Sequence, residues 1–472
     1  MLINLNQDDV DQKNSKLYDV AIIGAGAAGI TLALHLALNK QSVALIEGGN
    51  YDYTDESQEI YKAKSIGDPY YDLDATRLRY FGGSTNHWGG YCRTFESIDF
   101  NRGYLGEKFE WPIDFYEIDK YRKQACEILE IPATFKDITV ANSNIKQIDI
   151  HESPPVRFRE KYFERLINNQ FIDVYINSNL TDVKSENRKI NEIKLISYTF
   201  KNLNVKAKNF VFAMGGIENS RYLLWLQQVY KDKLFSISPS LGKYWMEHPH
   251  YKLGQALIDK SKVSGYYYAL SGNAQKKQNI LNCGFRVHHY DEKITKKLIR
   301  QVLCLAPSLG KKLINLAKKD LVCGAILRAS WEQAPDFSNM ITLDTEKDKF
   351  GIPKPILNWK KRPFDRVTIT KSVAEFNKWL VETDRGRVQI IDWITQELDY
   401  PNDDQLLGGH HHMGGTRMHN NIKFGVVDSN CRVHGSKNLY IAGSSVFTTG
   451  GHNNPTLPIV QLALRLGDHL IT

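Results

Sequence analysis

The sequence predicts an α/β protein (α+β overall), built as a Rossmann-type domain with an antiparallel-sheet domain inserted into it. The first observation is a short apolar strand, a glycine-rich turn, a helix and a second apolar strand near the N-terminus. The second is that buried-strand patterns of the same kind return much later, separated by segments that alternate apolar and polar residues. A chain of 472 residues also exceeds what one compact core usually holds, so two domains are expected.

The N-terminal unit is a βαβ arrangement. Residues 19–23 (DVAII) and 42–47 (SVALIE) have the unbroken apolar character of parallel strands buried on both faces. Residues 27–38 between them are apolar and long enough for a helix that packs on the sheet. Together the three elements form a βαβ unit.

The remaining elements assign the chain to two domains. Strand patterns at 205–213 and 439–442 belong with the N-terminal sheet, whereas 266–270 and 339–343 alternate as a half-exposed antiparallel sheet does, and a helix is expected at 363–380. The region 111–167 is mixed and largely helical. We therefore predict a discontinuous nucleotide-binding domain (15–110, 168–253 and 401–472) and a substrate domain (111–167 and 254–400).

Composition excludes several classes of protein. The net charge is only +8, from 61 basic and 53 acidic residues, and no basic block is interleaved with aromatics, so nucleic acid is not expected as a partner. No apolar run is long enough for a transmembrane segment, and the first residues do not resemble a secretory signal, so we expect a cytoplasmic protein. The six cysteines form no C-x-x-C pair, which argues against iron–sulfur and zinc sites.

One stretch departs from this even distribution of charge. Residues 296–319 read as one or two basic amphipathic helices. We expect them to pack on their own domain, and contact with an anionic membrane or a partner protein is the alternative.

The turn after the first strand is a dinucleotide-binding motif. Gly24, Gly26 and Gly29 form G-x-G-x-x-G, which allows a tight turn, close approach of a pyrophosphate and close packing of helix on strand. The phosphates would lie at the helix N-terminus, where free N–H groups favour negative charge. Glu47 ends the second strand 18 residues after Gly29 (47 minus 29), where a carboxylate can bind a ribose hydroxyl. This favours FAD or NAD over NADP.

The turn itself cannot distinguish FAD from NAD, so the choice between them depends on three further segments. They are RYFGGSTNHWGGYCR (79–93), HHHMGGTRM (410–418) and NLYIAGSSVFTTGGHNNPTLPIVQLALRL (438–466). In the last one a strand and a glycine–serine turn lead into a helix entered through Asn454 and Pro455, where Asn suits the N-cap and Pro the first turn.

These segments, in this order, resemble the glucose–methanol–choline (GMC) oxidoreductases, closest to the branch with pyranose 2-oxidase and the sugar dehydrogenases. The resemblance spans nearly the whole chain and implies FAD in an extended pose. The cofactor-binding residues that we expect are Gly24, Gly26, Ala28, Gly29, Glu47, Gly48, Gly82, Gly83, Ser84, Asn86, His87, Gly89, Gly90, Leu180, Gly215, Gly443, Ser444, Asn454, Pro455 and Thr456.

The resemblance also implies a catalytic pair, His412 before GGT and Asn454 before PTL. Oxidation of an alcohol removes a hydroxyl proton, for which a histidine is a suitable base, and a hydride, which goes to flavin N5. A neutral amide can orient the same oxygen. His411 and His452 are the next candidates for the base, and a metal is not expected at the three consecutive histidines, because no nearby acidic or cysteine ligand completes a set.

The implied activity is oxidation of a sugar, glycoside or cyclitol-like polyol, with O₂ or another oxidant as the electron acceptor. A non-redox flavin lyase of the same family is the alternative. In pyranose 2-oxidase the histidine that matches His87 bonds covalently to the flavin, and here the sequence leaves both attachments open with non-covalent FAD preferred. His248 and His250 are expected to be structural, and the oligomeric state stays open.

Overall fold

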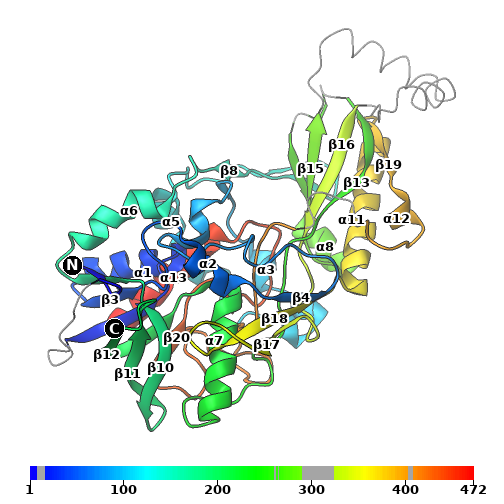
Figure 1. Cartoon of the computed structure of the whole chain (residues 1–472). Coiled ribbons are helices and arrows are strands. Elements are labelled where there is room, and N and C mark those ends of the chain that lie inside the picture. Colours follow the sequence, from blue (N-terminus) through cyan, green and yellow to red (C-terminus); the bar gives the residue numbers. More distant parts are fainter. Residues whose placement is uncertain (8–15, 260–261, 264, 290–323, 402–407) are drawn as a thin grey trace.

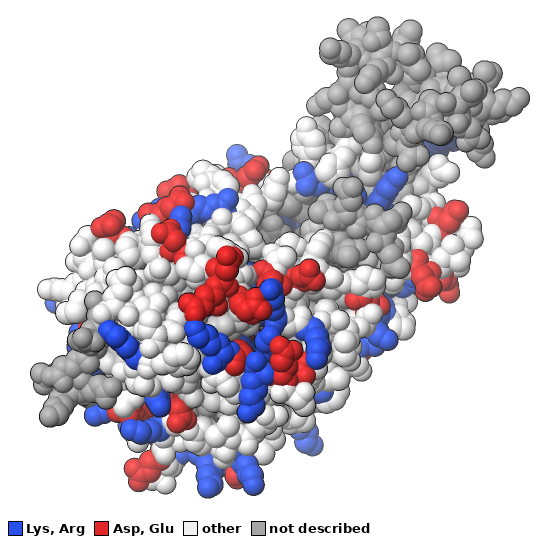
Figure 2. All heavy atoms as spheres, viewed as in Figure 1, with Lys and Arg blue, Asp and Glu red and all other residues white. Residues whose placement is uncertain are grey.

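The computed structural model describes residues 1–7, 16–259, 262–263, 265–289, 324–401 and 408–472 (Figure 1). The basic stretch 296–319 lies outside the described residues. The molecule has a broad body that contains both termini and a narrower lobe that carries β13, β15 and β16. On the face shown in Figure 2, acidic and basic side chains are interspersed.

The body is built on an eight-stranded sheet in the order β1-β9-β3-β2-β12-β11-β10, with β20 also paired to β12. From β1 to β12, and between β12 and β20, all pairs are parallel, while β10 and β11 extend the edge antiparallel. The strands are β1 (Leu2–Asn4), β2 (Leu17–Ile23), β3 (Val43–Ile46), β9 (Ile172–Ile176), β10 (Asn179–Glu186), β11 (Lys189–Ile196), β12 (Asn202–Phe212) and β20 (Leu439–Ile441).

The predicted strands of this sheet are confirmed as β2, β3, β12 and β20, with ends that differ by a few residues. The predicted helix is α1 (Ala27–Leu38). It packs against the C-terminal helix α13 (Thr456–Ile471), and α7 (Gly215–Tyr230) follows β12. Strand β3 is buried at every position, as its unbroken apolar run predicts.

The lobe contains a seven-stranded antiparallel sheet in the order β19-β13-β16-β15-β14-β7-β6. Helix α11 (Pro363–Glu382) covers one face of it, and the Phe376 ring stacks on Phe285 with centroids 4.8 Å apart (Figure 1). The strands are β6 (Ile138–Thr139), β7 (Ile145–Gln147), β13 (His250–Ile258), β14 (Tyr267–Leu270), β15 (Cys283–His289), β16 (Ala325–Trp331) and β19 (Gly386–Ile390).

Two small sheets join distant parts of the chain. Strand β4 (Lys64–Gly67) pairs in parallel with β18 (Pro353–Trp359), which pairs antiparallel with β17 (Met340–Lys347). Strand β5 (Tyr91–Cys92) pairs with β8 (His151–Glu152). The other helices are α2 (Asp55–Gln58), α3 (Ser97–Phe100), α4 (Phe115–Asp119), α5 (Arg122–Ile128), α6 (Phe158–Ile167), α8 (Gly272–Gln278) and α12 (Asp392–Thr395).

Within the described segments, no helix has both the length and the apolar character that crossing a membrane requires.

Candidate functional site

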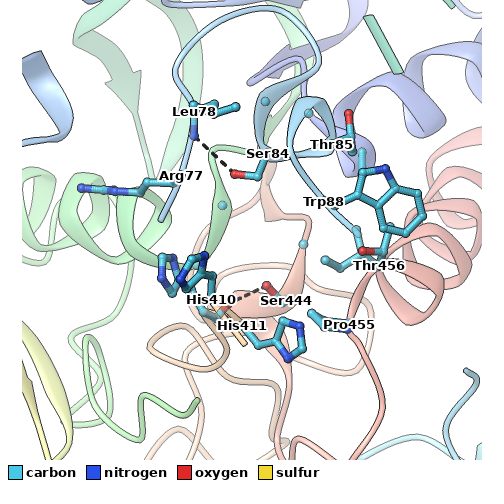
Figure 3. A pocket seen from close by; sticks show the side chains of 18 of the residues that line it. Arg77, Leu78, Ser84, Thr85, Trp88, His410, His411, Ser444, Pro455 and Thr456 are labelled. Carbon is cyan, nitrogen blue, oxygen red and sulfur yellow. Dashed lines mark hydrogen bonds between the residues drawn. The ribbon is translucent and has the colours of Figure 1, made fainter. Parts of the chain in front are cut away.

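A cavity of about 450 Å³ runs through the body and brings together four distant parts of the chain (Figure 3). These parts are the turn after β2, the loop at 76–91, the start of α7, and the C-terminal segments 409–412 and 443–459. The predicted site residues that line it are Gly24, Gly26, Ala28, Glu47, Gly83, Ser84, His87, Gly89, Gly90, Gly215, His412, Gly443, Ser444, Asn454, Pro455 and Thr456.

The turn between β2 and α1 depends on its glycines in two different ways. Gly24 has φ +112°, and a Cβ on Gly29 would lie 1.9 Å from the Gly24 carbonyl oxygen, so both positions are restricted by the fold itself. Gly26 is in extended backbone, with φ −90° and ψ −166°, and nothing lies within 4 Å of where its Cβ would be. Gly26 therefore borders open cavity.

The cavity fits a large ligand that approaches the backbone closely. Like Gly26, Gly215 and Gly443 line it and have no atom within 4 Å of an added Cβ. Five predicted residues lie outside the lining: Gly29, Gly48, Gly82, Asn86 and Leu180. A Cβ added at Gly48, for example, would lie 2.4 Å from the Arg79 guanidinium.

Glu47 is buried at the end of β3 and is fixed by the backbone. Its Oε2 accepts a hydrogen bond from the N–H of Ala25 (3.0 Å) and its Oε1 from the N–H of Gly49 (2.9 Å). A carboxylate oxygen can accept further bonds, so Glu47 can still bind a ribose hydroxyl from the cavity.

The loop that carries the three histidines is held by the buried carboxyl group of Glu247. Its Oε1 accepts from the N–H groups of His411 (2.8 Å) and Gly409 (3.3 Å), and the Tyr70 hydroxyl donates to its Oε2. Burial raises the pKa of Glu247 to about 7. Glu247 thus positions the loop, and no motif of the sequence pointed to it.

His411 lies on the side of this loop that faces the lobe. His248 Nε2 is 2.7 Å from the Gly451 carbonyl oxygen, so in a neutral ring this nitrogen carries the proton. His248 Nδ1 must then accept from His411 Nδ1, 2.8 Å away, which leaves His411 Nε2 with a lone pair. His248 therefore orients His411, and the structure gives His411 the protonation state of a base.

His412 is buried between the cavity and two aromatic residues. Its ring centroid lies 5.6 Å from that of Trp245 and 6.3 Å from that of Tyr70, and its carbonyl oxygen accepts from the Ser444 hydroxyl (2.6 Å). Within the described part of the chain its Nε2 has no hydrogen-bond partner. Burial, reinforced by Arg77, holds the pKa of His412 well below its usual range, so the ring is neutral at pH 7.

Asn454 lines the cavity directly before α13. Its Nδ2 donates to the Tyr91 carbonyl oxygen (3.0 Å), which fixes the amide, and its Oδ1 has no hydrogen bond to the described residues. The predicted capping was wrong: Pro455 is the N-cap residue of α13, and the Asn454 side chain bonds to β5 instead of to the helix. Asn454 is thereby available to a ligand.

Arg77 is a cavity residue that the sequence analysis missed. Its guanidinium forms an ion pair with Glu218 (2.6 Å) and donates to the Tyr61 carbonyl oxygen (3.0 Å). No sequence motif marks it, because its position depends on contacts with residues far away in the chain. His452 was a predicted alternative base, and it packs against Gly284 of the lobe, with both ring nitrogens unpartnered among the described residues.

Replacing Glu247 with glutamine is expected to change how stability depends on pH. In the folded protein the pKa of about 7 exceeds the ordinary 4.5, so folded chains bind more protons between these values. The Glu247 carboxyl contributes its full stabilisation of the fold below about pH 4.5, and this contribution is lost as the pH rises to about 7. Urea unfolding of both proteins across this range should show the wild type losing about 3 kcal/mol relative to Glu247→Gln. Parallel curves would contradict the assignment.

Comparisons with known proteins show which families and relatives the chain is similar to. The GMC oxidoreductase family model matches residues 335–463, and an FAD-binding-domain model matches residues 19–54. The chain is 24% identical to the fructose dehydrogenase large subunit of Gluconobacter japonicus. The matching region covers 57% of this chain and 48% of the length of that protein. It is 22% identical to 2-methyl-1,2-propanediol dehydrogenase of Mycolicibacterium austroafricanum, over 96% of this chain and 95% of that protein.

Solved structures share the fold along almost the whole chain. Formate oxidase of Aspergillus oryzae RIB40 has a TM-score of 0.57 at 15% identity, covering 97% of this chain and 98% of that chain. Pyridoxine 4-oxidase from Mesorbium loti has a TM-score of 0.55 at 13% identity, covering 96% and 99%. The two family models, together with the glycine-lined cavity, show that the chain carries an FAD-binding domain and the C-terminal domain of the GMC oxidoreductases, and that it is an oxidoreductase whose cofactor is FAD.

Proposed function

We propose that this enzyme oxidises an alcohol group of a sugar, glycoside or cyclitol-like polyol to a ketone or aldehyde. The observation that carries the proposal is that one cavity joins the dinucleotide turn to His412 and Asn454. A substrate held against these two side chains would lie beside the cofactor that the same cavity takes.

His412 is assigned as the base and Asn454 as the group that orients the substrate hydroxyl. A neutral imidazole can accept the hydroxyl proton, and the low pKa of His412 keeps it neutral. Asn454, fixed by Tyr91, can bind the same oxygen without competing for the proton. FAD, when bound, would supply the redox chemistry as the acceptor of the hydride.

Two relatives support an alcohol as substrate, since their names give fructose and 2-methyl-1,2-propanediol as what those proteins act on. The likeness to the pyranose 2-oxidase branch in HMGGTRM and HNNPTLP favours a carbohydrate. We place the enzyme in the cytoplasm, with O₂ or another oxidant as the acceptor.

A polyol screen under anaerobic conditions tests the proposal. We expect the flavin absorbance to bleach with at least one polyol, and exposure to air then tests O₂ as the acceptor. Turnover of a cyanohydrin or fatty acid without bleaching would instead support the lyase.

Acid precipitation of the same protein should leave the yellow colour in the supernatant, because FAD is proposed to be held without a bond to His87.

Replacing Asn454 with alanine should slow anaerobic flavin reduction by an amount equivalent to about 1–3 kcal/mol, the cost of a lost buried hydrogen bond. Stopped-flow measurement of the reduction rate gives this value. In combination with His412→Ala, the loss should be smaller than the sum, because both residues act on one oxygen. Strict additivity would mean that the two side chains act on different atoms.

A further inference from the structure

The sheet of the lobe has two faces with different neighbours. On β15, Phe285 and Val287 are buried in the lobe's core, with Phe285 against α11. Because side chains alternate along a strand, Gly284, Arg286 and His288 lie on the opposite face. This second face is the one that α11 leaves uncovered (Figure 1).

The uncovered face meets the loops of the candidate site. A Cβ on Gly284 would lie 3.0 Å from Cδ2 of His452, and the ring of His250 is 6.2 Å from that of His411. Gly284 and His250 are both aligned with Ser330 on the strand between them. On the same face, the residues two positions further along these strands are Arg286, Arg328 and Lys252, which therefore lie close to the loops of the site.

Those next residues form a row of cations. Arg286 on β15 is directly opposite Arg328 on β16, which is directly opposite Lys252 on β13. Tyr267 on β14 completes the row beside Arg286. Arg286 is the exposed cation of this row, whereas Arg328 and Lys252 are partly buried.

Arg286 reaches toward the catalytic pair. Its guanidinium carbon lies 5.8 Å from the ring centroid of Tyr91 and 5.5 Å from that of Tyr267. Tyr91 lines the cavity, and its carbonyl oxygen accepts the hydrogen bond from Asn454. The side chain of Arg286 is exposed, and among the described residues no carboxylate forms an ion pair with it.

We propose that Arg286 binds an anionic group of the alcohol substrate, so that the substrate is a polyol bearing a carboxylate or a phosphate. A guanidinium presents paired donors that match either anion. The inference rests on the proposed function, because it places the anion on a molecule whose hydroxyl reaches His412 and Asn454.

Two histidines on this face are kept neutral mainly by burial. Burial lowers the pKa of His250 to about 3, with Arg328 and Arg286 adding to the effect, and that of His288 to about 4. Both rings are neutral at pH 7. The cationic side chains of the row on this face are therefore Lys252, Arg286 and Arg328.

The test uses the FAD-loaded enzyme and three probes: glucose, glucuronate and glucose 6-phosphate. Dissociation constants come from calorimetry and from perturbation of the flavin spectrum, at low and high salt. At low salt we expect an anionic probe to bind at least 10-fold more tightly than glucose, and the two anions show whether carboxylate or phosphate is preferred. Salt should reduce the preference.

Variants assign the effect to Arg286. Arg286→Leu should weaken binding of the preferred anion about 10–100-fold and leave glucose unchanged. Arg286→Lys should retain part of the affinity for the anion. Lys378→Ala, which removes an exposed cation from α11, should change nothing. Equal binding of all three probes by the wild type, or a preference that survives in Arg286→Leu, would overturn the proposal.

The outcome is separable from that of the proposed function. If a neutral polyol bleaches the flavin while no anion is preferred, alcohol oxidation stands and the anion site does not. If the anion binds through Arg286 and no polyol bleaches the flavin, the anion site stands and alcohol oxidation does not.

Discussion

Replacing His412 with alanine is expected to slow anaerobic reduction of the flavin by about 100-fold or more while FAD stays bound. A positioned base contributes about 10²–10⁴-fold to such a step. His412 lines the cavity, is neutral at pH 7, and has an Nε2 without a partner among the described residues, so a substrate hydroxyl can supply the missing bond. Stopped-flow absorbance with the substrate found in the polyol screen measures the rate.

His411→Ala is the matched comparison, because His411 is next in the chain and also lines the cavity. The His411 ring is oriented by His248 toward the lobe. If His412 is the base, His411→Ala should therefore slow flavin reduction less than His412→Ala does. Should His411→Ala be the slower variant, the role of base passes to His411, whose Nε2 carries a lone pair. Flavin content, measured for both proteins, excludes loss of the cofactor as the cause.

Replacing Gly26 with valine is expected to abolish FAD binding without unfolding the protein. The Gly26 backbone is extended, a conformation that valine adopts readily, and its Cβ would meet no atom within 4 Å. The added side chain would therefore occupy the space that we assign to the pyrophosphate. Purified Gly26→Val should be colourless, with a melting temperature close to that of wild-type protein stripped of flavin.

Gly29→Ala separates this effect from damage to the fold. A Cβ at Gly29 would lie 1.9 Å from the Gly24 carbonyl oxygen, so helix α1 would have to move away from its strand. This variant should lower the melting temperature of the flavin-free protein itself. A yellow Gly26→Val with the flavin content of the wild type would show that the pyrophosphate does not approach this turn.

The sequence identified those parts of the site that depend on local backbone geometry. Gly24, Gly26 and Glu47 could be found because a tight turn, an open N-terminus of a helix and a carboxylate at a strand end each require certain residues at fixed spacing. His412 and Asn454 came from the resemblance to a family, and the structure brings both to one cavity.

Other parts could not be read from the sequence. Glu247 holds the histidine loop through hydrogen bonds to residues more than 160 positions away, and Arg77 reaches the cavity through Glu218, 141 positions further on. Neither lies in a recognisable motif. The prediction that Asn454 caps α13 was wrong because its amide donates to the Tyr91 carbonyl oxygen, 363 positions away, and not to the adjacent helix.

By itself, the sequence determined the Rossmann-type sheet and the dinucleotide turn, since apolar periodicity and glycine spacing act within a few residues of one another. The C-terminal segments were indicated by the resemblance to a family. Only the tertiary structure decided how the three histidines are divided, with His411 held by His248 and His412 packed beside Trp245. It also decided that Arg286 and Arg328 share one face of the lobe, because strand register, which sets that alignment, is a property of pairing between distant segments.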